Sequence, residues 1–269
     1  MFVSYKEIRH CCLKPDEAVK PLYARYVTHT FSTLLVWLLQ PISLAPNWIS
    51  LASLLTAFSS LFFFAKLTAL SALTGAILVE LYYILDAVDG QWARFKKMKS
   101  LSGAFFDYLI NYALQPPLFF AIGWGLYRQT ASAFYLLLGF IAAFSSLWVL
   151  LIWDIRASIL LAHLRNKGFS NQTGEPASFL TARKPKLSRE IFTVLHKSLV
   201  FPWLMNVLTI VSFLSFFLAH FIETPLAHLL GFRIFLYYYS LAGPCVALSI
   251  TVYWIWKRKI DHAPELNTA

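Results

Sequence analysis

Long stretches of apolar, uncharged residues alternate with short polar connections along the chain. Six of these stretches have about the length needed to cross a hydrocarbon layer, which takes roughly 20 helical residues. They are Asn47–Ala65, Leu67–Leu85, Ala104–Tyr127, Ala131–Trp153, Ser198–Ala219 and Ala227–Trp256. The pattern predicts an all-α polytopic membrane protein with six transmembrane helices.

A shorter apolar run, Phe31–Leu39, precedes the six spans. It follows a segment of mixed charge and ends at Gln40 and Pro41, so it is typical of an amphipathic helix that lies in the membrane interface. Pro46 then opens the first span, because proline is tolerated in the first turn of a helix. We expect a single integral membrane domain, with an interfacial segment at 1–45, a six-helix bundle at 46–257 and a tail at 258–269.

The composition excludes a soluble globular protein. Hydrophobic residues make up 58% of the chain and charged residues 13%, whereas an ordinary soluble domain is about one quarter charged. On a soluble chain the net charge of +10 would suggest a nucleic-acid partner. Here, all but three of the 23 Lys and Arg fall on one side of the predicted membrane, the exceptions being Lys66, Arg128 and Arg233.

This asymmetry in charge predicts the topology. Lys and Arg are retained on the cytoplasmic face of a membrane, so we expect both termini in the cytoplasm and contact with anionic membrane lipids there. No nucleic-acid partner is expected. The expected location is an inner or plasma membrane, or the endoplasmic reticulum in a eukaryotic cell.

Acidic residues near one end of the second and third spans are the candidates for chemistry, because carboxylates inside spans are costly. Asp86 and Asp89 share one helical face, and Asp107 and Asn111 share another. In an antiparallel hairpin both pairs lie at one depth, since they are equally distant from the turn. Converging carboxylates need a cation, and oxygen ligands favour Mg²⁺ or Mn²⁺. We therefore predict a divalent-metal site that opens to the cytoplasm.

Small residues and one arginine flank these acids. Gly90, Ala93 and Gly103 would let a ligand approach the backbone, and Arg94 offers two parallel donors to a phosphate. The pattern indicates a metal-dependent site for a phosphorylated compound. A salt-bridged hairpin end is the competing interpretation, and it is disfavoured because Arg94 alone cannot balance three carboxylates.

The same residues resemble the signature of the CDP-alcohol phosphotransferase family. Seven of the eight signature residues are present at the family's spacing: Asp86, Asp89, Gly90, Ala93, Arg94, Gly103 and Asp107. The segment Pro46-Asn47-Trp48-Ile49-Ser50 is also similar to the Pro-Asn-x-x-Ser/Thr that commonly opens the first span in this family. The six spans and the short first helix agree with the family's layout.

The resemblance implies an enzyme of phospholipid biosynthesis. Such an enzyme moves a phosphoalcohol group, here expected to be phosphatidyl, from a CDP-linked lipid or alcohol donor to an alcohol or polyol-phosphate acceptor and releases CMP. By the resemblance, Asp86, Asp89 and Asp107 would hold one or two divalent ions on the donor diphosphate. The nucleotide and phosphate pocket would be lined by Gly90, Ala93, Arg94 and Gly103. Dimers are common among such proteins, so a homodimer is plausible.

The eighth signature residue departs from the family. The family's last Asp, which is thought to act as the base on the acceptor hydroxyl, is Asn111 here. An amide oxygen can coordinate a cation but cannot take up a proton. Asp154, near the cytoplasmic end of the fourth span, or a phosphate of the acceptor could replace the base. The remaining alternatives are a slower reaction without a base and the loss of activity.

Two other functions compete with the transferase. A cation transporter would distribute ionisable residues through the membrane, whereas these cluster near one face. A catalytically silent relative that binds CDP-lipid is supported only by Asn111. Glu80 lies about 120° around the helix from Asp86, which favours a packing partner over a metal ligand.

Overall fold

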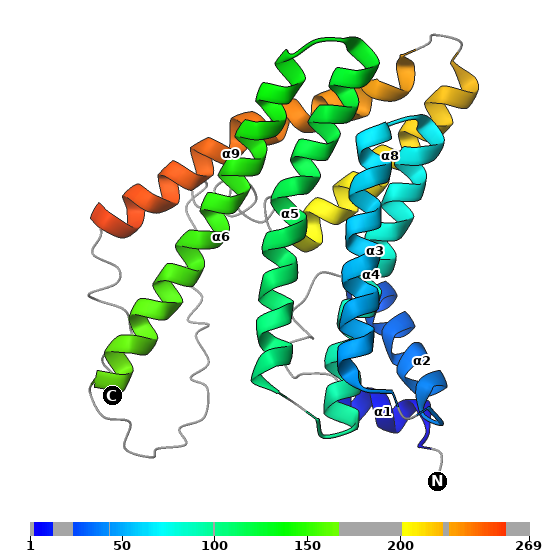
Figure 1. The fold of residues 1–269 in the computed structure, drawn as a ribbon, viewed down its shortest axis with the longest axis vertical. Helices are drawn as coiled ribbons and strands as arrows, with labels where there is room; N and C mark the ends of the chain where they lie inside the picture. Colours follow the sequence, from blue (N-terminus) through cyan, green and yellow to red (C-terminus); the bar gives the residue numbers. More distant parts are fainter. Residues whose placement is uncertain are drawn as a thin grey trace, which may run out of the picture.

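The computed structural model describes residues 3–12, 24–42, 44–98, 100–166, 201–222 and 226–256. In these ranges the chain is helical and contains no β-strand, which confirms the predicted all-α class (Figure 1). Long helices run roughly side by side, and short helices pack at the end that holds the N-terminus.

Five of the described helices are long and apolar enough to cross a membrane. They are α3 (Pro46–Lys66), α4 (Ala69–Phe95), α6 (Phe134–Asn166), α8 (Phe201–Phe221), and α9 (Leu230–Trp256) with the 3₁₀ turn η3 (Ala227–Leu229) before it. Each contains most of one predicted span. The largest changes are at the ends of two helices: α6 continues 13 residues beyond the predicted end at Trp153, and α4 continues ten residues beyond the predicted end at Leu85.

The sixth predicted span, Ala104–Tyr127, lies within α5 (Leu101–Thr130), but this helix is less apolar than the other five. Asn111, Gln115 and the prolines 116 and 117 lower its hydropathy. The helix begins beside the end of α4 and finishes beside the start of α6, so it crosses the same layer as its two neighbours (Figure 1). Apolarity alone therefore identifies five spans, and connectivity identifies the sixth.

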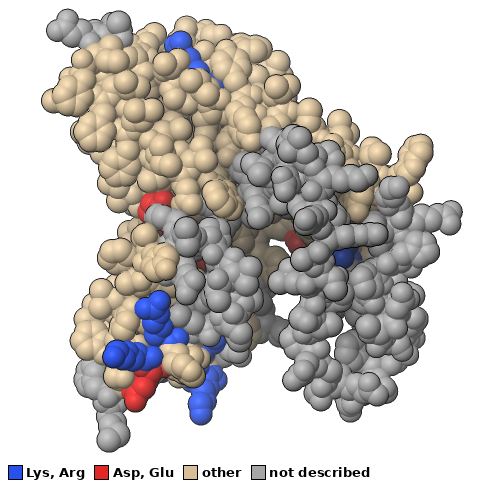
Figure 2. All heavy atoms as spheres, turned by 180° about the vertical axis from the view of Figure 1, so that it is seen from behind, with Lys and Arg blue, Asp and Glu red and all other residues tan. Residues whose placement is uncertain are grey.

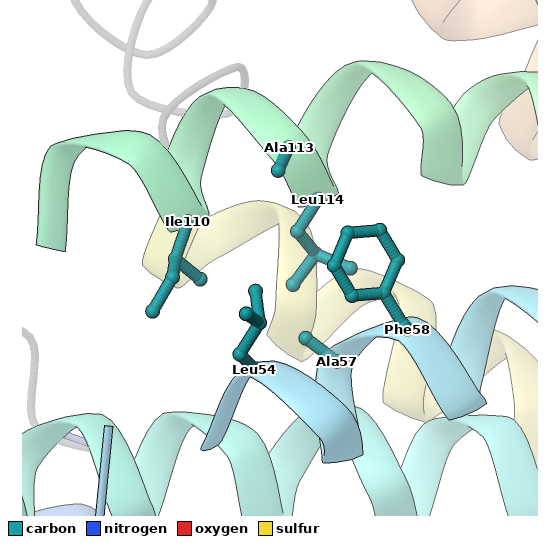
Figure 3. Close-up of a pocket in the computed structure, with 6 residues that line it drawn as sticks. All are labelled: Leu54, Ala57, Phe58, Ile110, Ala113 and Leu114. Atoms are coloured by element: carbon teal, nitrogen blue, oxygen red, sulfur yellow. The ribbon is translucent and has the colours of Figure 1, made fainter. Parts of the chain in front are cut away.

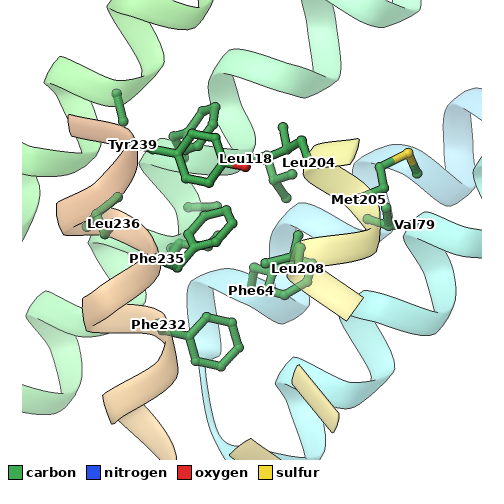
Figure 4. Packing of buried hydrophobic residues seen from close by; sticks show 14 of the residues in the cluster. Phe64, Val79, Leu118, Leu204, Met205, Leu208, Phe232, Phe235, Leu236 and Tyr239 are labelled. Atoms are coloured by element: carbon green, nitrogen blue, oxygen red, sulfur yellow. The ribbon is translucent and has the colours of Figure 1, made fainter. Parts of the chain in front are cut away.

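Helix α3 organises the bundle, because it packs against both α4 and α5. Helix α6 packs against α5 and α9, and α8 packs against α4. Aromatic and aliphatic side chains fill the space between these helices (Figure 4). The rings of Phe119 and Phe235 stack at 5.9 Å, and Tyr239 lies against both rings. Packing of this kind is the main force between helices in lipid.

Glycines set the close approach of α5 to α6. A Cβ atom placed on Gly123 would lie 2.6 Å from the carbonyl oxygen of Tyr135, and one on Gly139 would lie 3.1 Å from that of Phe119. Both positions exclude a larger side chain without a shift of backbone. Small residues allow helices to pack closely in membranes, and this contact fixes α6 alongside the part of α5 that leads to Asn111.

The N-terminal segment forms helix α1 (Tyr5–Cys12), a π-helical turn η2 (Ala24–Thr28) and helix α2 (His29–Leu39). The predicted short helix is thus present, starting two residues earlier. It packs on α4 and α1. A second, smaller apolar cluster joins these helices to the ends of α3 and α4, through the buried side chains Ile8, Cys12, Val36, Ile49, Val88 and Trp92. Its depth relative to a membrane remains a prediction, as do the domain limits at 45 and 257.

The turn between α5 and α6 yields a test of stability. Ala131 ends α5 in a left-handed conformation, with φ of 56°, which is costly for any residue with a Cβ atom. We expect Ala131→Gly to raise the free energy of unfolding by about 0.5–1 kcal/mol, measured by SDS titration in detergent micelles. The matched control is Ala133→Gly, at an exposed position with negative φ, which should lower it. A loss of stability in both variants would contradict this account.

Candidate active site

The signature begins in the last third of α4. Residues 86–94 are helical, so Asp86 and Asp89 lie on one face, less than a full turn apart. Asp89 is buried, with 6% of its surface exposed, and Asp86 is half-buried. An ionised carboxylate buried to this extent requires hydrogen-bond donors or a cation.

Ser50 supplies one such donor. Its hydroxyl donates a hydrogen bond to Oδ2 of Asp89, with an oxygen–oxygen distance of 2.7 Å. Ser50 lies in the first turns of α3, which Pro46 opens at its first helical position. The contact therefore joins the Pro-Asn-x-x-Ser segment to the acidic signature 39 residues later. Sequence reasoning missed this role, although the resemblance had singled out the segment.

Helix α5 carries the other half of the predicted metal site. It runs antiparallel to α4 and starts after a short connection, as predicted (Figure 1). Asp107 lies in its second turn, but its side chain is not described; Asn111, one turn further on, is half-buried. In the described parts of the chain, α3 packs closely on both helices, whereas α4 and α5 do not pack closely on each other.

The convergence of the four oxygen ligands therefore remains a prediction. Among side chains that the structure describes, no group of three His, Cys, Asp or Glu could hold a metal ion. That set lacks Asp107, the third predicted carboxylate. Asp86 and Asp89 lie on one face of α4. Asp107 and Asn111 lie on α5, at the same distances along the chain from the turn that connects the two helices.

The predicted phosphate pocket has space at Gly90. A Cβ atom there would meet only the guanidinium of Arg94, with 3.5 Å to Nη1 and 3.8 Å to Nη2. This is ordinary contact, so the protein's own packing does not require glycine. Ala93, on the same turn, is half-buried, and its carbonyl oxygen accepts a hydrogen bond from the amide of Met98 at 2.8 Å.

Gly103 has a structural role at the start of α5. The hydroxyl of Ser100 caps the helix by accepting a hydrogen bond from the amide of Gly103 at 3.0 Å. A Cβ atom on Gly103 would approach that hydroxyl to 3.3 Å. Because Gly103 has no side chain, the hydroxyl of Ser100 can lie close to its amide. The position at a helix N-terminus also suits an anionic ligand.

Asp154, the candidate replacement base, has a partner on α5. Its Oδ2 accepts a short hydrogen bond from the hydroxyl of Tyr112, the residue after Asn111. Both side chains are half-buried. Tyr112 and Asp154 lie at equal distances from residue 133 in the turn between α5 and α6. The pair was predictable from that spacing, yet Tyr112 was not singled out.

Glu80 lies apart from the signature. Its Oε1 accepts a hydrogen bond from the hydroxyl of Thr209 on α8 at 2.6 Å. A role in packing between α4 and α8 agrees with the predicted direction of the side chain, away from the face of Asp86.

Charge is unevenly distributed over the molecule. Figure 2 shows Lys and Arg side chains gathered at the end where α1 lies. The described basic residues there include Lys6, Arg9, Lys96 and Lys97, while Lys66 and Arg128 lie at the opposite ends of α3 and α5. The signature is thus at the basic half of the bundle.

A comparison with curated proteins finds no match. The family model for CDP-alcohol phosphatidyltransferases matches residues 43–218, which contain all the signature positions. The family implies a membrane phosphotransferase with a CDP-alcohol donor and an alcohol acceptor. Because the match covers more than half of the chain, the protein belongs to the CDP-alcohol phosphatidyltransferase family.

Proposed function

We propose that this protein is a phospholipid-synthesising enzyme that moves a phosphatidyl group from CDP-diacylglycerol to an alcohol or polyol-phosphate acceptor and releases CMP. The observation that carries the proposal is the buried Asp89, held by Ser50 on the signature face of α4. A carboxylate kept in this environment, with a second one less than a turn away, is suited to bind a cation.

Two of the described acidic residues offer ligands for a divalent ion. Asp86 and Asp89 offer only oxygen atoms, the donors that Mg²⁺ and Mn²⁺ prefer, and Asp107 would complete the set from α5. The diphosphate would bind over Gly90, beside the guanidinium of Arg94. When bound, the ion would supply neutralisation of the negative charge on the diphosphate and on the leaving CMP.

The other signature residues bind and orient the donor. Gly90 and Ala93 allow the diphosphate to approach α4, and the guanidinium of Arg94 lies over that space, where it can donate paired hydrogen bonds to phosphate oxygens. Gly103 lies in the first turn of α5, where the positive end of the helix dipole favours an anion. In phosphoryl transfer, positioning and charge stabilisation provide most of the catalysis.

The acceptor hydroxyl needs a base that takes up its proton. The acceptor hydroxyl oxygen bonds to the phosphorus that carries the donor alcohol, while the bond from that phosphorus to the bridging oxygen breaks. CMP leaves with the bridging oxygen, and the hydroxyl proton passes to the carboxylate of Asp154. The hydrogen bond from Tyr112 orients this carboxylate. Asn111, the preceding residue, orients the acceptor through its amide without taking a proton.

Apolar packing between α3 and α5 lies beside the site (Figure 3). The gap between these side chains is too narrow for a water molecule. Its lining is entirely hydrophobic: Leu54, Ala57, Phe58, Ile110, Ala113 and Leu114. Ile110 precedes Asn111, so this packing of α3 on α5 helps to hold Asn111 in place.

The distribution of charge supports a site on the cytoplasmic side, with both termini there. The basic end of the molecule (Figure 2) would face the cytoplasm and its anionic lipids. The membrane would be an inner or plasma membrane, or the endoplasmic reticulum of a eukaryotic cell. A homodimer is compatible with this arrangement.

Release of CMP tests the proposed function. With Mn²⁺, CDP-diacylglycerol and a panel of polyol, polyol-phosphate and amino-alcohol acceptors, we expect acceptor-dependent CMP from the purified protein in mixed micelles, measured by chromatography. EDTA should abolish it. A protein that binds CDP and metal but never releases CMP, even as Asn111→Asp, would instead be a silent relative. Ion flux in proteoliposomes without CMP release would indicate a transporter.

Two acids on α4 distinguish the proposed metal face from the packing face. Asp89→Asn should abolish Mn²⁺-dependent binding of CDP in isothermal titration calorimetry, because it removes a charge from the metal site. Glu80→Gln should leave binding within about twofold, since the amide oxygen still accepts from Thr209. An equal loss in both variants would mean that the wrong face of α4 has been assigned to the metal.

Asp154 and Asn111 can be tested as alternative positions for the base. Asp154→Asn should lower kcat about 10²–10⁴-fold, the usual contribution of a general base, with little change in CDP affinity. Adding Asn111→Asp to this variant should restore part of the loss, because it returns a carboxylate to the position that the family uses. An undiminished kcat in Asp154→Asn would contradict the assignment and favour a phosphate of the acceptor as the base.

A further inference from the structure

Helix α1 packs directly on the signature end of α4. It lies outside residues 43–218, the part of the chain that the family model matches. Its side chains Ile8 and Cys12 are buried in the cluster that also holds Val88 and Trp92, both within the signature. Burial against these apolar groups raises the pKa of the Cys12 thiol to about 12. The helix is thus an integral part of this end of the bundle.

Polar contacts fix the start of α1. The side chain of Gln40, at the end of α2, accepts a hydrogen bond from the amide of Val3 at 2.9 Å and donates one to its carbonyl oxygen at 3.0 Å. Ser4 and Glu7 form a capping box, in which each side chain accepts from the other's amide, at 2.9 and 3.3 Å. The hydrogen bond from the Ser4 amide lowers the pKa of Glu7.

The other end of α1 meets the arginine of the signature. Nε of Arg94 donates a hydrogen bond to the carbonyl oxygen of Cys12 at 2.5 Å. Cys12 is the last residue of α1 that the structure describes, and a hydrogen bond from a charged guanidinium to a carbonyl oxygen is stronger than one between neutral groups. The same guanidinium directs Nη1 and Nη2 over Gly90, within 3.5 and 3.8 Å of the position of a Cβ atom.

We propose that α1 is a positioning element for the donor site, which holds Arg94 by its Nε so that Nη1 and Nη2 face the space where the diphosphate binds. The proposal rests on the proposed function. It makes α1, which lies outside the part of the chain that the family model matches, a part of the donor site. An arginine has a long side chain with many rotamers, and ordering it on binding weakens affinity. A guanidinium already held by Cys12 avoids most of that loss.

The first test measures CDP affinity in the presence of Mn²⁺ by calorimetry on the full-length protein. Ile8→Asp, which places a charge in the buried face of α1, should weaken binding about three- to tenfold, the effect of freeing one long side chain. Gln40→Leu removes the anchor at Val3 more gently and should act in the same direction. The matched control is His10→Asp, on the exposed face of α1, which should leave affinity unchanged.

The second test reads the docking of α1 without any substrate. In a Cys11→Ser, Cys245→Ser background, Cys12 is the single thiol of the chain, and its burial should make maleimide labelling slow. Adding Arg94→Ala should speed the labelling several-fold, because α1 loses its contact at Cys12. In the background protein, CDP with Mn²⁺ should slow the labelling of Cys12. If docked α1 strengthens the binding of CDP, bound CDP must in turn strengthen the docking of α1.

The outcomes separate this inference from the proposed function. Unchanged CDP affinity in Ile8→Asp, tighter binding in that variant, or Cys12 labelling that Arg94→Ala does not alter would each overturn the positioning role while CDP still binds the native chain. Failure of the native chain to bind CDP at all would overturn the proposed function, and the positioning role would fall with it.

Discussion

A negative charge buried in an apolar bundle is the constraint on which this structure depends. Asp89 is only 6% exposed. The hydrogen bond from Ser50 compensates part of its desolvation, but a carboxylate pair at this depth needs a positive partner. A divalent ion that binds together with the donor diphosphate would explain three features: the spacing of the signature, the glycine at position 90 and the arginine at position 94.

The same constraint explains why α5 differs from its neighbours. This helix lacks an apolar stretch as strong as those of the other five long helices, and it carries the half-buried Asn111 and Tyr112 and the buried Gln115. Its polar side chains are paired across helices: Tyr112 with Asp154, and Gln115 with Ser146 at 2.8 Å. The close contact at Gly123 holds α6 near enough for these pairs to form. Polar function on α5 is thus supported by packing further along the same helix.

Much of the fold could be predicted from the chain, since apolar length and charge asymmetry are local properties. The ends of helices could be predicted less well. Helix α4 continues past Leu85 because its polar residues face α3 and the N-terminal helices rather than lipid. For the site, spacing along α4 placed Asp86 and Asp89 on one face. Contacts between distant segments, such as Ser50 with Asp89 and Cys12 with Arg94, could not be predicted, because they depend on how helices pack rather than on periodicity.

The most direct test of the central claim is the position of the ion itself. Crystals of the protein grown with Mn²⁺ and CDP should give an anomalous scattering peak between α4 and α5, at roughly 2.0–2.2 Å from carboxylate oxygens of Asp86, Asp89 and Asp107. The peak should vanish in Asp89→Asn. A peak elsewhere in the bundle, or bound CDP with no ion beside these three residues, would contradict the account.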